Sequence, residues 1–112
     1  GGFTLLRGKN NRENDHVTMR MAKGGDIWFH ARNIPGSHVI LVCEGREPAV
    51  ADQEEAAALA AFYSKAGASN RVPVDYTRAK HVKKPSGARP GMVNYFEFKT
   101  MLIEPKDLEE AE

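Results

Sequence analysis

A few side chains of this 112-residue chain have the chemistry that catalysis or metal binding would need. Ser37 and His38 have the residue types of a nucleophile and its base, but neighbours on a strand point to opposite faces, so we expect no hydrogen bond between them. His30, His38 and Cys43 lack the close ligand pairs, such as C-x-x-C, that structural zinc sites use. Asp26 offers one carboxylate where acid–base catalysis uses a pair. With no GxxxxGK[ST] phosphate loop either, the sequence predicts no catalytic set, no metal site and no cofactor.

Positive charge is concentrated in one part of the chain. The formal net charge is only +1, but residues 104–112 hold five acids and one Lys, so residues 1–103 carry 15 bases and 10 acids. Residues 65–92 alone hold seven bases and one acid. Clustering of this kind is typical of a polyanion-binding surface. Charge by itself fits a solvated, Lys-rich loop equally well.

Two stretches combine aromatic rings with cations. One runs from Trp28 to Arg32 and the other from Tyr76 to Lys84. Unpaired RNA needs this combination, because bases stack on rings while phosphates pair with Lys and Arg. Both Trp28 and Phe29 also suit a hydrophobic core. We favour the core for Phe29, and for Trp28 we expect partial burial with one exposed edge that is able to stack on RNA.

Short strands and two helices are the elements that would hold these groups. The longer helix is expected to begin at Asp52, which makes a capping-box pair with Glu55 ahead of apolar residues at helical spacing. A shorter helix, capped by Asn10 or Asn11, is expected to run to about Ala22. Strands are expected at residues 3–6, 27–30, 37–43 and 71–77, followed by a basic loop at 80–90 and a last strand or hairpin at 92–103.

This pattern predicts one α+β domain built of α/β layers, with a small mixed sheet, one short helix and one longer helix. The domain is expected to span residues 1–103, and the acidic residues 104–112 are expected to form a frayed tail. Pro73 places its strand at a sheet edge, or itself at the start of the strand. The near-continuous apolar run at 37–43 indicates a strand covered on both faces.

Composition excludes several classes of protein. Hydrophobic residues at 41% and charged residues at 28% are typical of an ordinary globular domain and argue against wholesale disorder. No apolar run approaches the roughly 18 residues that a membrane span needs, and no signal peptide is visible. The chain begins Gly1-Gly2 rather than with Met, so we expect a segment of a longer protein. The single Cys43 fits a reducing compartment.

Five motifs follow one another along the chain. They are GKNNREND at 8–15, DIWFHARNIPGSHVIL at 26–41, EAAALAAFYSKA at 55–66, VPVDYT at 72–77 and VKKPSGARPGMVNY at 82–95. Together they resemble the NFACT-R domain, the C-terminal RNA-binding domain of the Rqc2/RqcH/NEMF proteins. In many bacteria these proteins are also called fibronectin-binding protein A. The resemblance covers about residues 3–103, with the motifs in the order and spacing of the family.

The resemblance implies a non-catalytic, cytoplasmic RNA-binding domain. Family members engage large ribosomal subunits that still carry peptidyl-tRNA, and they promote untemplated addition of residues to the nascent chain in ribosome-associated quality control. We therefore expect tRNA or rRNA, the large ribosomal subunit and the other domains of a longer parent protein as partners, and no membrane. This domain alone should bind RNA without elongating anything.

Twelve residues match the motifs of the family and have the residue types that contact RNA. Most of the affinity is expected from the loop at 80–91, whose Lys83, Lys84 and Arg89 we expect to be unburied. The full set of predicted RNA-binding residues is Lys9, Asn10, Asn11, Arg12, Trp28, His30, Arg32, His38, Lys80, Lys83, Lys84 and Arg89.

Two other functions stay open. One is part of an RNA-modifying enzyme, for which His30, His38 and Asp26 are the only plausible catalytic set. The lack of paired carboxylates and of a metal set weighs against it. The other is a fibronectin-binding adhesin, which has no signal, anchor motif or disulfide in its favour.

Overall fold

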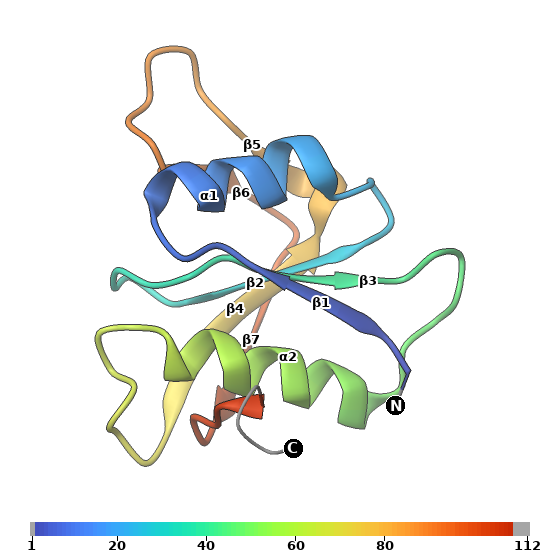
Figure 1. Ribbon diagram of the computed structural model, residues 1–112, viewed down its shortest axis with the longest axis vertical. Coiled ribbons are helices and arrows are strands. Elements are labelled where there is room, and N and C mark those ends of the chain that lie inside the picture. Colours follow the sequence, from blue (N-terminus) through green and yellow to red (C-terminus); the bar gives the residue numbers. More distant parts are fainter. Residues whose placement is uncertain (1, 109–112) are drawn as a thin grey trace.

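The structure, a computed structural model, describes residues 2–108 of the chain. A five-stranded sheet, ordered β1-β3-β2-β4-β7, forms the middle layer (Figure 1). A second sheet joins β5 to β6. The strands are β1 (Thr4–Arg7), β2 (Ile27–Ala31), β3 (Val39–Val42), β4 (Val72–Arg78), β5 (Val82–Lys83), β6 (Asn94–Tyr95) and β7 (Lys99–Ile103).

The α+β class and the single layered domain are as predicted, but the sheet is not mixed. Every strand pair within residues 2–108 is antiparallel. β2 and β3 form a hairpin, and the chain then crosses through helix α2 (Val50–Phe62) to place β4 on the far side of β2. β3 and β4 therefore run parallel to each other, but β2 lies between them, so no parallel pair forms.

Helix α2 covers one face of the sheet, here called the α2 face. Its buried side is made of alanines and Leu59, and small side chains let the helix lie close to the strands. The helix begins at Val50 rather than at the predicted Asp52. Asp52 is the third helical residue, and its carboxylate accepts the backbone N–H of Ala49 at 3.0 Å. The helix ends at Phe62, with Tyr63 as C-cap, before the predicted end at Gly67.

The opposite face, here called the α1 face, is covered by α1 (Asn11–Asp15), by the π-helix η1 (His16–Met21) and by the β5–β6 hairpin. Asn10 caps α1 as predicted, because its side chain accepts the N–H of Glu13 at 2.9 Å. The predicted helix to Ala22 is α-helical only in its first half. In its second half it widens to π geometry, and the N–H of Ala22 bonds to the carbonyl of Val17.

Pro73 and the C-terminal residues 104–108 both have defined places in the fold. Pro73 is the second residue of β4, as the strand-start alternative predicts, and β4 lies inside the sheet between β2 and β7.

In the expected tail, the N–H of Lys106 bonds to the carbonyl of Ala58, and the hydroxyl of Tyr63 donates to Asp107. Residues 109–112 lie outside the described residues, so fraying there stays a prediction. Along residues 2–108, no helix is long and apolar enough to span a bilayer.

Candidate nucleic-acid interface

Strand alternation sorts the predicted site residues onto the α1 face. In β2, Phe29 points into the α2-side core, whereas Trp28 and His30 point the other way. His38, directly before β3, and Asp75 of β4 lie on the same side as Trp28. The sheet therefore gathers aromatic and polar groups from three strands beneath α1, η1 and the β5–β6 hairpin.

Trp28 is a core residue. Its side chain has no exposed surface and lies in a cluster with Val17, Ile40 and Val82. The indole Nε1–H donates to His38 Nδ1 at 3.1 Å. The expected exposed edge is wrong, because η1 and the β5–β6 hairpin close over the ring. Trp28 therefore cannot offer a free face on which RNA could stack.

His38 is the polar centre of this layer. Its Nδ1 accepts hydrogen bonds from the Thr18 hydroxyl at 2.8 Å and from Trp28, so the neutral ring carries its proton on Nε2. The backbone N–H of His38 donates to Asn14 Oδ1 at 3.0 Å, which ties α1 to the sheet. Burial, and then the neighbouring His30, lower the pKa of His38 to about 3. At neutral pH His38 is therefore an uncharged structural group.

Asp75 is a second buried polar centre, and it engages Arg32. Its carboxylate accepts from Arg32 Nη1 at 3.0 Å, from the Thr100 hydroxyl at 2.6 Å and from the Tyr95 hydroxyl at 2.5 Å. Burial and the bond to Asp75 raise the pKa of Tyr95. The Arg32 side chain remains 42% exposed, so its outer edge stays open to a ligand.

The 84–93 loop is fastened to α1. The N–H of Gly91 donates to Asp15 Oδ1 at 3.0 Å. Lys84 Nζ donates to the carbonyls of Arg89 and Met92 at 2.5 and 2.9 Å and lies 3.2 Å from Asp15. Gly91 has a φ of +85°, and a Cβ there would lie 2.6 Å from the side chain of Asn11. Lys84 thus holds the loop in shape, and its side chain is only 24% exposed, against our expectation of an unburied residue.

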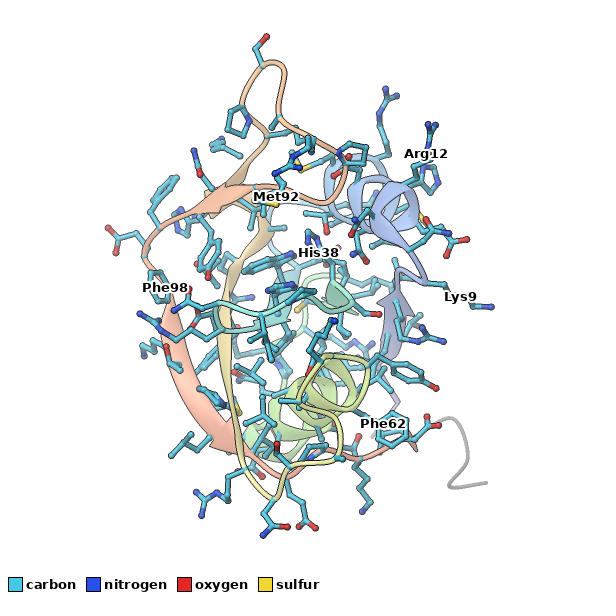
Figure 2. All side chains as sticks on the ribbon, turned by 90° about the vertical axis from the view of Figure 1, so that its left-hand side faces the viewer. Lys9, Arg12, His38, Phe62, Met92 and Phe98 are labelled. Carbon is cyan, nitrogen blue, oxygen red and sulfur yellow. The ribbon has the colours of Figure 1, made fainter. Side chains whose placement is uncertain are left out.

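A cavity of about 460 Å³ opens between α1, the β2–β3 connection and the 84–93 loop. Asn11 lines it from α1, Asn33 and Pro35 from the connection, and Met92 and Tyr95 from the loop and β6. Figure 2 shows Met92 above His38, with Arg12 and Lys9 extended outward on the α1 side. The walls of the cavity are mainly apolar, and the α1 and loop segments that border it carry the exposed cations Arg12 and Arg89.

The twelve predicted residues separate into three groups. Exposed residues in the α1 and hairpin segments are Lys9, Asn10, Asn11, Arg12, Lys83 and Arg89. Of these, Asn11 lines the cavity and Asn10 also caps α1. Those engaged in the protein's own bonds are Trp28, His30, Arg32, His38 and Lys84.

Lys80 makes up the third group alone. Its N–H bonds to Gly24 at the opposite end of the sheet, and its side chain borders a different hollow beside Cys43.

Sequence reasoning named four of the twelve residues that line the cavity, and Asn33, Met92 and Tyr95 are among those it missed. Asn33 has a φ of +60°, which is uncommon for a residue other than glycine. Its place directly before the Ile-Pro-Gly turn was the available signal. Met92 and Tyr95 lie in the last four residues of the motif at 82–95, but neither carries the charge that marks a phosphate contact.

Of the three residues considered for catalysis, His30 and His38 lie together, with ring centroids 5.2 Å apart, but Asp26 lies apart from them. The carboxylate of Asp26 accepts the N–H of Cys43 at 2.9 Å and that of Lys23 at 2.8 Å, directly before β2 begins. His30 is the fourth residue of β2, so it lies roughly 13 Å further along the strand. Within residues 2–108, no group of three or more His, Cys, Asp or Glu side chains is placed to hold a metal ion.

A basic surface around an apolar cavity, on one face of an antiparallel α+β sheet, defines a candidate nucleic-acid-binding domain. Comparison with known proteins gives the family. Residues 1–96 match the family described as the NFACT protein RNA binding domain. The chain belongs to this family.

Similar proteins are longer than this chain. The Rqc2 homolog RqcH of Bacillus subtilis (strain 168) is 50% identical over 104 residues, and that of Streptococcus suis (strain 05ZYH33) is 46% identical over 107 residues. These matches cover 93% and 96% of this chain but only 18% and 19% of the relatives. A solved structure, the C-terminal part of the fibronectin/fibrinogen-binding protein from Streptococcus suis, superposes with a TM-score of 0.90 at 46% identity, covering 96% of this chain and 43% of the other.

Proposed function

We propose that this domain binds RNA through the surface formed by the start of α1 and the 84–93 loop, without catalysing a reaction. The observation that carries the proposal is the hydrogen bond from Gly91 to Asp15, which holds the basic loop against a helix 76 residues away in sequence. The segments brought together carry three exposed cations, which are Lys9 before α1, Arg12 in α1 and Arg89 in the loop. Membership of an RNA-binding family supports the same conclusion.

The proposed ligand is tRNA or rRNA on a stalled large ribosomal subunit, and the proposed setting is ribosome-associated quality control in the cytoplasm. Support comes from the relatives called Rqc2 homolog RqcH. Because this chain spans less than a fifth of those relatives, the other domains of a longer parent protein would supply any elongation activity.

RNA binding is tested by its salt dependence. We expect the domain to bind a structured hairpin RNA with a loop, and about five phosphate contacts would give a log–log salt slope near −3.5 to −4.5. Replacing Arg12, Lys83 and Arg89 together by Ala removes three exposed cations and should flatten the slope by about two units. An affinity that does not change between low and physiological salt would contradict the proposal.

A matched control separates this surface from overall charge. Lys65, Arg71 and Lys106 are exposed cations outside the α1 and loop segments, and their replacement by Ala changes the net charge by the same amount. We expect that control triple variant to keep most of the affinity and the full slope. Equal losses in both triple variants would mean that RNA senses only net charge.

The Streptococcus suis structure favours one second candidate. That protein is called fibronectin/fibrinogen-binding. Immobilised fibronectin therefore belongs beside RNA in the same assay. Binding to fibronectin that the Arg12, Lys83 and Arg89 changes leave intact, together with no RNA binding, would favour the second candidate.

A further inference from the structure

We propose that the cavity between α1, the β2–β3 connection and the 84–93 loop receives one unpaired nucleobase of the bound RNA, with Asn11 and Asn33 contacting the edge of the base. This inference rests on the proposed RNA-binding function and names the part of the RNA that the domain takes in. The cavity volume of about 460 Å³ lies within the range of about 300–1,000 Å³ that is usual for small-molecule pockets.

The chemistry of the cavity suits a base rather than a phosphate. Its walls include Ile34, Pro35 and Met92, and the two imidazoles that line it, His30 and His38, are held uncharged by burial, which lowers the pKa of both. A phosphate placed among these groups would lose its water and gain no cation in return. A nucleobase is flat and uncharged, and it carries hydrogen-bonding groups only at its edges.

Met92 indicates that the mouth of the cavity is a contact surface. Its side chain is 56% exposed, although it is one of the large apolar residues lining the cavity. Tyr95, also in the lining, is fixed by its hydroxyl bond to Asp75 and by contact with Trp28 at 4.6 Å between ring centroids. Together a rigid ring and a flexible thioether provide apolar surfaces against which a base can lie.

Asn11 and Asn33 provide polar groups for the edge of the base. Both are exposed, both line the cavity, and neither side-chain amide has a hydrogen-bond partner among residues 2–108. Each amide has an acceptor and two donors, the combination that matches the edges of bases. Asn33 has a φ of +60°, a left-handed conformation in which Asn is enriched among residues other than glycine, so the turn itself accommodates this amide at the cavity.

The charges around the cavity are placed for the flanking phosphates. Arg12 follows Asn11, Arg32 precedes Asn33, and Arg89 precedes Pro90, so each side of the lining has an exposed arginine next to it in sequence. The cavity is therefore uncharged inside, and each segment that lines it carries an exposed arginine. An unpaired nucleotide has the complementary pattern, with an uncharged base between two anionic phosphates.

The single tryptophan offers a direct test, because the buried Trp28 ring packs against His38 and Tyr95, which line the cavity. The probes are a 12-nucleotide single-stranded oligoadenylate RNA and the same strand annealed to its complement, at equal salt. Polarisation of a label on the RNA measures binding, and Trp28 fluorescence measures occupation of the cavity. We expect the single strand to change Trp28 fluorescence on binding, and we expect the duplex to leave it unchanged.

Variants then test the amides. Asn11→Ala combined with Asn33→Gly removes both amides, and glycine accepts the positive φ at position 33. This double variant should bind the single strand about tenfold more weakly, at an unchanged salt slope. The matched control is Asn70→Ala, an exposed asparagine outside the cavity, which should bind as wild type does.

The outcomes separate this inference from the proposed function. Single-stranded RNA that binds at full affinity to the double variant, or without changing Trp28 fluorescence, overturns the base pocket and leaves RNA binding in place. An equal fluorescence change with the duplex also overturns it. Failure of both RNAs to bind contradicts the proposed function itself. A Trp28 response to an apolar peptide but to neither RNA assigns the cavity to a protein partner.

Discussion

The two faces of the sheet are built in different ways. The α2 face is an apolar core in which alanines of α2 contact residues such as Phe29, Leu41 and Val74. The α1 face has a small apolar cluster and, beside it, buried polar side chains that include Asn14, His38 and Asp75. Apolar burial is non-directional, whereas hydrogen bonds fix positions. The comparison indicates that one face mainly stabilises the domain and the other mainly shapes the site.

The polar layer is complete in its hydrogen bonding. Within residues 2–108, no buried side-chain nitrogen or oxygen lacks a partner. Asn14 shows how the bonds position the site, because its Oδ1 accepts from the N–H of His38 at 3.0 Å and its Nδ2 donates to the carbonyl of Gly36 at 3.2 Å. α1 is thus held to the strand and to the turn that border the cavity. Any change in this layer should move the site as well as weaken the fold.

Replacing Trp28 should give the largest effect. Trp28→Ala removes a fully buried ring and leaves His38 without one donor, so we expect a loss of about 3–5 kcal/mol in the free energy of unfolding. Phe29→Ala, on the α2 face, is the matched change and should cost a similar amount. Urea unfolding measures both. A Trp28 variant with unchanged stability and weakened RNA binding would restore the stacking role and show that the Trp28 cluster adds little to the stability of the domain.

Acid should weaken the α1 face more than the α2 face, through His38. Its pKa is about 3 in the folded domain and ordinarily about 6.5, so below pH 6.5 the unfolded chain takes up a proton that the folded chain refuses. Stability is therefore unaffected above that pH and falls as pH drops towards 3. Between pH 7 and 4.5 the expected loss from this group is about 2–3 kcal/mol.

The control for this prediction is His38→Asn, which keeps an acceptor near the Nδ1 position but does not titrate. Its free energy of unfolding should fall less than that of the wild type over the same pH interval, whatever its stability at pH 7. Urea unfolding at several pH values measures the two slopes. Equal slopes would show that His38 takes up a proton as readily in the folded domain as in the unfolded chain, which would contradict the lowered pKa.

Local patterns were predicted well from the sequence. The strands of the five-stranded sheet, the Asn10 cap and the α+β class follow from alternation, capping chemistry and turn residues, which act over a few positions. β5 was missed, because it lies within the segment predicted as a basic loop at 80–90. The start of α2 was misplaced by two residues because Asp52 caps from inside the helix rather than from its first position. The change from α to π geometry in η1 has no short-range signal and depends on how the helix docks on the sheet.

The site was predicted only in part, because it depends on contacts between distant segments. Residue type alone cannot distinguish Lys83, which is exposed, from Lys84, which the structure uses to hold the loop. In the same way, no residue close to Trp28 in sequence indicates that the β5–β6 hairpin covers its ring. Charge and aromatic content found the correct segments, and long-range packing decided which side chains in them face outward.

The smallest expected effect distinguishes two consecutive lysines. Lys84→Ala removes hydrogen bonds to the carbonyls of Arg89 and Met92 and should cost about 1–2 kcal/mol of stability. Lys83→Ala removes an exposed cation and should change stability by less than about 0.5 kcal/mol. Because the N–H of Gly91 bonds to Asp15, its hydrogen exchange should speed up in the Lys84 variant only. For RNA, Lys83→Ala should flatten the salt slope by up to about 0.7, whereas Lys84→Ala should also disorder the cavity wall. Equal stability and equal Gly91 exchange in the two variants would mean that Lys84 does not hold the loop.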